Sequence, residues 1–144
     1  MEKTAVDYAN SFSKSFDYSK DSISDLEEIL QYYHEDVAKS MPTENQLWSM
    51  SCIWGAYLGE VLLSNGLEKI GFEWNITEDS TIPVLKRNDE IIAPIDKVYK
   101  RLVNGSEDNV ISFFDVISEM VGWQNSGWGT EQSTFYEEKE GEKQ

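Results

Sequence analysis

Cysteine, histidine and long apolar runs are scarce in this chain. Its 144 residues include one cysteine and one histidine. A single cysteine excludes an internal disulfide, and a structural zinc site takes about four ligands that are mostly cysteine and histidine. No run of about 18 apolar residues occurs, which predicts no transmembrane helix. The first residues lack a basic stretch followed by an apolar one, as a signal peptide would have. Together these absences predict a cytoplasmic protein.

Basic residues are also few. Twelve Lys and Arg stand against 27 Asp and Glu, which gives a net charge of −15 at pH 7. Such a surface repels phosphate backbones, so the charge argues against nucleic-acid binding. It would attract a basic protein, or it serves only to keep the chain in solution, and the sequence leaves both interpretations open.

Residues for catalysis are nearly missing. His34 and Cys52 could form a nucleophilic pair on paper. However, Cys52 lies in an apolar stretch typical of a buried inert thiol, and His34 lies in a polar helix where an exposed position is expected. The glycines of 55–71 do not follow a strand, as phosphate-binding loops require. We therefore predict no catalytic residue, no cofactor and no metal site.

The apolar spacing predicts an α+β fold. About four helices are expected to pack on a small antiparallel sheet formed by the middle of the chain, over 72–93, where alternation replaces helical spacing. Residues 1–130 are expected to form a single domain, and 131–144 a mobile acidic tail. The helical segments are an amphipathic piece over 4–16 and helices over 22–39, 43–64, 94–104 and 106–121.

Local signals mark the ends of these elements. Thr43 and Gln46 have the spacing of a capping box. Ser22 and Ser106 are expected N-caps, and Asn88 begins the expected hairpin turn. Pro94 suits the first turn of a helix.

Two glycines, Gly55 and Gly59, lie four residues apart inside the apolar helix. Each costs about 1 kcal/mol relative to alanine in a helix interior. We interpret them as a face that lets another backbone element approach closely, because a small side chain removes the steric barrier to such contact.

One candidate pocket combines Glu60 with the basic segment that contains Lys97, Lys100 and Arg101. Glu60 follows Gly59 in a helix with little other charge, and Lys97 and Arg101 share a helical face by their spacing. The functional interpretation is a small-molecule or anion site. The alternative is an ordinary ion pair between these groups, because structural ion pairs are common.

A candidate partner surface lies near the start of the second helix. Asp21, Asp25 and Glu28 fall on neighbouring turns and are expected to present one negative stripe. Such a stripe would steer a basic protein towards the chain.

The segments "GAYLGEV" (55–61) and "PIDKVYKRLVNGSED" (94–108), with Trp74 between them, resemble the DUF3806-like family of small bacterial proteins. The resemblance covers roughly 17–121. It implies an α+β fold, brings no established activity, and assigns no catalytic residue.

Two function classes follow. The first is a non-catalytic interaction protein, such as an immunity protein against a basic toxin. The second is a small-molecule-binding or enzymatic module that uses Glu60 and the segment from Lys97 to Arg101. The sequence indicates neither a membrane partner nor an oligomeric state.

Overall fold

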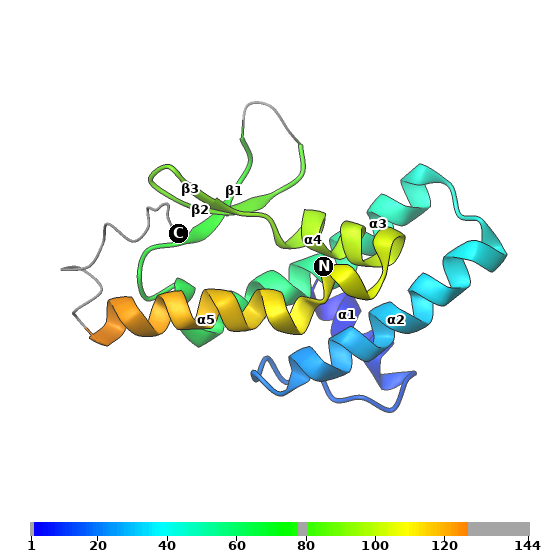
Figure 1. Cartoon of the computed structure of the whole chain (residues 1–144), viewed down its shortest axis with the longest axis horizontal. Helices are drawn as coiled ribbons and strands as arrows, with labels where there is room; N and C mark the ends of the chain where they lie inside the picture. The colour runs from blue at the N-terminus through cyan, green and yellow to red at the C-terminus, as the bar shows by residue number, and fades with distance from the viewer. Residues whose placement is uncertain (1, 78–80, 127–144) are drawn as a thin grey trace.

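The computed structural model of the chain describes residues 2–77 and 81–126, which form an α+β fold (Figure 1). The predicted class is confirmed. Within these residues there are five α-helices instead of about four, because the amphipathic piece expected over 4–16 forms a helix of its own over Glu2–Asn10. The predicted tail, 131–144, lies outside the described residues.

The helices are α1 (Glu2–Asn10), α2 (Ser22–Ser40), α3 (Glu44–Leu62), α4 (Pro94–Asn104) and α5 (Val110–Ser126), the strands are β1 (Glu73–Asn75), β2 (Val84–Arg87) and β3 (Glu90–Ile92), and two short turns of helix are η1 (Leu63–Leu67) and η2 (Ser106–Asp108). No helix in this part of the chain has both the length and the apolar character needed to cross a bilayer.

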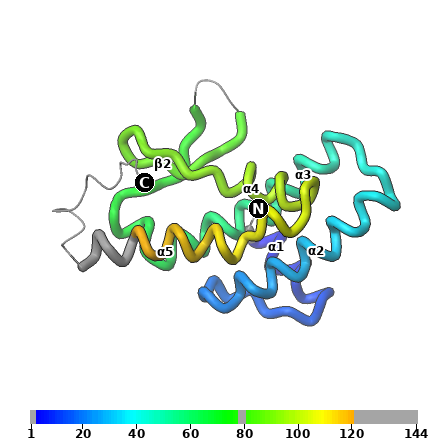
Figure 2. The backbone as a smooth tube through the Cα atoms, in the orientation of Figure 1, coloured from blue at the N-terminus to red at the C-terminus, as the bar shows by residue number. Residues whose placement is uncertain are grey.

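Helix α3 is central to the packing. It contacts α1 and α4, while α4 also contacts α2, and α5 packs against α2 and α4. In Figure 1 the sheet lies above α5, and α2 and α3 extend away from it to the joining loop. The tube in Figure 2 shows α5 running beside the chain that leaves α3, consistent with its contacts to η1. One cluster of buried residues draws on all five helices and β2.

The sheet has the strand order β1-β2-β3 and is antiparallel throughout. Trp74, Leu85 and Ile92 form one cross-strand row, and Leu85 at its centre is fully buried. The predicted hairpin is confirmed, with Asn88 at a φ of 54° in the tight turn between β2 and β3. Pro83 precedes β2, so this central strand begins late, as a residue without an N–H requires.

The capping box of α3 forms as predicted. Thr43 N donates to Gln46 Oε1 at 2.8 Å, and Gln46 N donates to Thr43 Oγ1 at 3.1 Å. Two backbone donors at the helix start are therefore satisfied by a reciprocal pair. From this start α3 carries Trp54 and Tyr57 into the core, where both are buried.

The other two predicted caps are wrong. Asp21 occupies the N-cap position of α2, and Ser22 lies inside the helix, buried, with its hydroxyl 2.7 Å from the Tyr57 hydroxyl. Ser106 begins η2 rather than α5. The start of α5 is capped instead by Asn109, whose side-chain oxygen accepts from Ile111 N at 2.8 Å. The Ser22 hydroxyl contacts Tyr57 instead of capping α2. Ser106 begins the extra turn η2, so it lies too early in the chain to cap α5.

Gly55 and Gly59 both lie at close contacts. A β-carbon on Gly55 would be 2.5 Å from the Cα of Ile95, so the start of α4 lies directly on the α3 backbone. This confirms the predicted backbone approach. A β-carbon on Gly59 would instead overlap the indole of Trp74, so its close neighbour is a side chain from β1.

Candidate functional site

Glu60 is engaged by β1. Its Oε2 accepts a hydrogen bond from Trp74 Nε1 at 2.8 Å. The same indole packs against Gly59. Gly59 and Glu60 together therefore fix the position of the Trp74 side chain. The partner of Glu60 is therefore Trp74 of β1. No cation of α4 forms an ion pair with Glu60 in the described structure.

The three cations of α4 each pair with a different carboxylate, and none of these is Glu60. These pairs give the predicted pocket no support, because they draw the three side chains to partners other than Glu60. The pairs are Lys97 with Asp108 at 3.2 Å, Lys100 with Asp96 at 3.3 Å, and Arg101 with Glu27 at 2.6 Å.

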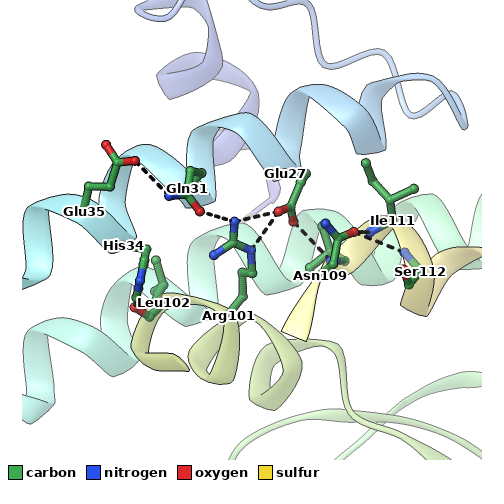
Figure 3. A network of polar contacts seen from close by, with 10 residues as sticks. Glu27, Gln31, His34, Glu35, Arg101, Leu102, Asn109, Ile111 and Ser112 are labelled. Atoms are coloured by element: carbon green, nitrogen blue, oxygen red, sulfur yellow. Dashed lines mark hydrogen bonds and ion pairs between the residues drawn. The ribbon is translucent and has the colours of Figure 1, made fainter. Parts of the chain in front are cut away.

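Arg101 is the one charged residue that is buried in the described part of the chain, and its side chain is 1% exposed. Arg101 Nε and Nη2 donate to Glu27 Oε2 at 2.9 and 2.6 Å (Figure 3). Nη2 also donates to Gln31 Oε1 at 2.5 Å. The other oxygen of Glu27 accepts from the backbone N–H of Val110 at 3.1 Å. One carboxylate of α2 thus holds α4 and the first turn of α5.

This arrangement is structural. A buried charge is tolerated where it is paired and hydrogen-bonded, and here Glu27 and Gln31 supply those partners. Arg101 Nη1 has no hydrogen-bond partner among the described residues. Arg101 does not line the cavity between β3 and α5, the one beside α1 or the one near η1, so we assign it no ligand.

His34 is not exposed as predicted. It is half-buried, and its Nδ1–H donates to the carbonyl of Leu102 at 2.7 Å. The ring also packs on Gly105, where a β-carbon would be 2.9 Å from Nε2. Gly105 has a φ of 91° that favours glycine. His34 therefore joins α2 to the end of α4.

Cys52 is half-buried rather than buried. Burial raises the pKa of its thiol above 9.0, and a thiol that stays protonated is a poor nucleophile. In the described ranges, no group of three or more His, Cys, Asp or Glu side chains is arranged to hold a metal ion.

The predicted acidic stripe is partly neutralised. Lys14, from the loop after α1, lies 3.5 Å from Asp25 and 2.8 Å from Glu28. Asp21 is exposed, and no ion pair joins it to another described residue. Sequence spacing places the three carboxylates along α2 but gives no indication of Lys14, which reaches them from another element.

A groove absent from the sequence predictions lies between β3 and α5, with a volume of about 720 Å³. Ile91 and Ile92 line it from β3, and Phe113, Val116 and Met120 line it from α5. We call this feature the β3–α5 groove. Ile91 and Val116 are 53% and 67% exposed, which is high for large aliphatic side chains. The helical spacing of the α5 residues could have indicated it.

The charge around the β3–α5 groove is negative. Lys97 lines it, but pairs with Asp108 and lies 5.5 Å from the centre of the Phe113 ring. Glu107 also lines the groove and is exposed, without an ion pair to another described residue. Exposed Asp115 and Glu119 lie on α5 beside Val116 and add further unpaired negative charge within the described chain.

A second hollow, of about 560 Å³, lies where α1 and the end of α2 meet the start of α3. Tyr8, Tyr33 and Trp54 form its aromatic side, and Asn45 and Ser49 lie at its polar side. Burial raises the pKa of the Tyr33 phenol above 10.0. This hollow holds no described cluster of acids, bases or nucleophiles that would indicate a reaction.

Comparison with known proteins finds no family model that matches the chain, and no curated protein or solved structure with significant similarity to it. The resemblance to the DUF3806-like family stays a prediction.

Proposed function

We propose that this protein is a non-catalytic interaction module of the cytoplasm that binds a basic protein, as an immunity protein binds a basic toxin. The observation that carries the proposal is the net charge of −15 on a chain of 144 residues. A field of that sign and strength raises the local concentration of cationic partners and their rate of encounter.

The distribution of charge supports this proposal. Asp21 at the start of α2, and Glu107, Asp115 and Glu119 near α5, are all exposed and have no ion pair within the described residues. Internal pairs therefore leave part of the acidic surface available to a partner. By contrast, the cations of α4 are committed to internal carboxylates, which removes the main support for an anion or small-molecule site.

The test begins with affinity capture from the native host, followed by association kinetics with the purified partner. At about 0.01 M ionic strength the Debye length is about 30 Å, and at about 0.15 M it is about 8 Å. We expect the association rate constant to fall markedly between these conditions, while the dissociation rate constant changes much less.

Charge reversal locates the effect. The triple variant Asp21→Lys, Asp25→Lys, Glu28→Lys should associate more slowly than the parent and lose part of its salt dependence. Because Asp25 and Glu28 also hold Lys14, a Lys14→Gln variant is the control. It breaks the same pairs but leaves the acidic groups in place, so it should not slow association. An association rate that ignores both salt and reversal would overturn the proposal.

A further inference from the structure

Helix α5 has two neighbouring apolar stripes. The first faces the core and includes Phe114 and Ile117, both buried. The second consists of Phe113, Val116 and Met120, which have the i, i+3, i+7 spacing of one helix face and line the β3–α5 groove. Phe113 also packs partly against the core and Met120 is half-buried, so Val116, at 67% exposure, is the part of this stripe most available for contact with another segment.

The opposite wall of the groove is the edge of the sheet. Among residues 2–77 and 81–126, strand β3 pairs with β2 alone, because the strand order is β1-β2-β3. Its Ile91 is 53% exposed and lines the groove opposite the α5 stripe. Edge strands that also expose aliphatic side chains are favourable places for another chain to bind.

Charge decides between the segments that could cover these walls. A second copy of this chain would bring its own Glu107, Asp115 and Glu119 against the same acidic groups. The sequence of 127–144 contains more acidic than basic residues, so it would also meet like charge. A basic segment instead gains favourable contacts with these carboxylates while its apolar residues fill the groove.

We propose that the β3–α5 groove binds a segment of a basic partner protein in which apolar residues are flanked by lysine or arginine. This inference rests on the proposed function and names the surface that makes the contact. Asp21, Asp25 and Glu28 contribute long-range attraction, whereas Ile91, Val116 and their neighbours in the groove make the short-range contact.

The probe is a fluorescein-labelled 14-residue peptide with leucines at i, i+3, i+4 and i+7 and lysines at the flanking positions. A second peptide has glutamate in place of every lysine, and a third has alanine in place of every leucine. Fluorescence anisotropy of each peptide with the full chain gives the dissociation constant. We expect saturable binding of the first peptide alone.

Two variants with the same change of charge separate groove binding from general attraction. Val116→Lys places a cation in the groove, and Val103→Lys places one on α4 at a valine that is 43% exposed and lies outside the groove. Val116→Lys should weaken binding of the lysine–leucine peptide by at least about tenfold, and Val103→Lys by less than about twofold. Both sites are exposed, so thermal unfolding of both variants should match the parent.

Each other result overturns the groove assignment in a distinct way. If both variants weaken binding equally, the peptide responds to the net charge of the protein and does not occupy the groove. The proposed function would then remain, but the β3–α5 groove would not be its binding surface. If no peptide binds, the groove assignment is wrong, and the proposed function is judged by the salt-dependent association rate of the captured partner.

Equal binding of the glutamate peptide would show that the groove does not select a basic segment, which also argues against the proposed function. A dimer in sedimentation that Val116→Lys dissociates would make a second copy the occupant. Shifted Val116 methyl resonances in a Trp128→Ala, Phe135→Ala variant, without peptide, would make 127–144 the occupant.

Discussion

The guanidinium of Arg101 donates two hydrogen bonds to a single carboxylate oxygen of Glu27, at 2.9 and 2.6 Å. The pair joins α2 to α4 through two residues that are 74 positions apart in the chain. Removing one member of a buried pair leaves the other charged and without its partner, at a cost of about 3–5 kcal/mol. We expect Glu27→Ala to lower the free energy of unfolding by that amount in urea titration.

A matched replacement tests the cause of that loss. In the double variant Glu27→Leu, Arg101→Met no charge is left unpaired, so the chain should be more stable than Glu27→Ala alone. If the double variant is the less stable of the two, the loss comes from packing and from the uncapped Val110 N–H rather than from the isolated guanidinium.

Gly55→Ala should destabilise the chain. The added methyl would lie 2.5 Å from Ile95 Cα, and a backbone atom cannot move without displacing the start of α4. Overpacking of this kind costs about 1–3 kcal/mol, whereas the same change on a bare helix surface gains up to about 1 kcal/mol. Denaturant titration distinguishes the two, and a gain in stability would contradict the close contact.

Gly59→Ala should also destabilise, for a different reason. Here the added methyl meets the indole of Trp74, and moving the indole stretches its hydrogen bond to Glu60. In a Trp74→Leu background the obstacle is absent, so the cost of Gly59→Ala should shrink by about 1 kcal/mol or more, a typical coupling between contacting residues. Additive losses would show that the indole is not the obstacle. Gly55→Ala should cost the same in both backgrounds.

Asp108 should make the chain less stable in acid. The hydrogen bond from Asn104, and after it the contact with Lys97, hold the pKa of this carboxyl below its ordinary value of 3.8. A group with a lowered pKa in the folded state stabilises the fold above its unfolded pKa, and this contribution is lost as pH falls through the folded pKa. The difference in unfolding free energy between the parent and Asp108→Asn should therefore be largest above about pH 5 and shrink as the pH falls below the ordinary value of 3.8. A constant difference across that range would contradict this assignment.

Local features of the fold could be read from the sequence. The capping box of Thr43 and Gln46 and the turn at Asn88 involve residues within a few positions of one another, so spacing alone specifies them. The contacts of Gly55 and Gly59 were also predictable. Glycine in a helix interior lowers stability relative to alanine, and a close neighbour that leaves no room for a side chain explains why glycine is present. Only the neighbour at Gly59 was of an unexpected kind.

The polar contacts of the candidate site could not be predicted, because their partners come from distant elements. Spacing placed Lys97 and Arg101 on one helical face, but Arg101 lies against α2 while Lys97 reaches Asp108 in η2. Lys14 likewise neutralises part of the acidic stripe from outside α2. The β3–α5 groove depends on where the sheet edge lies relative to α5, and one-dimensional spacing does not contain that placement.

The partners of Glu27 are synthesised long after Glu27 itself, because they lie in α4 and at the start of α5. Chains emerge from the N-terminus, so α1, α2 and α3 are complete before α4 exists. Until Arg101 and the N–H of Val110 appear, Glu27 has neither of these partners and must stay hydrated. The α2 surface that later packs against α4 and α5 therefore stays exposed to water in the nascent chain. The hydrophobic core is complete only when these last two helices have packed against it.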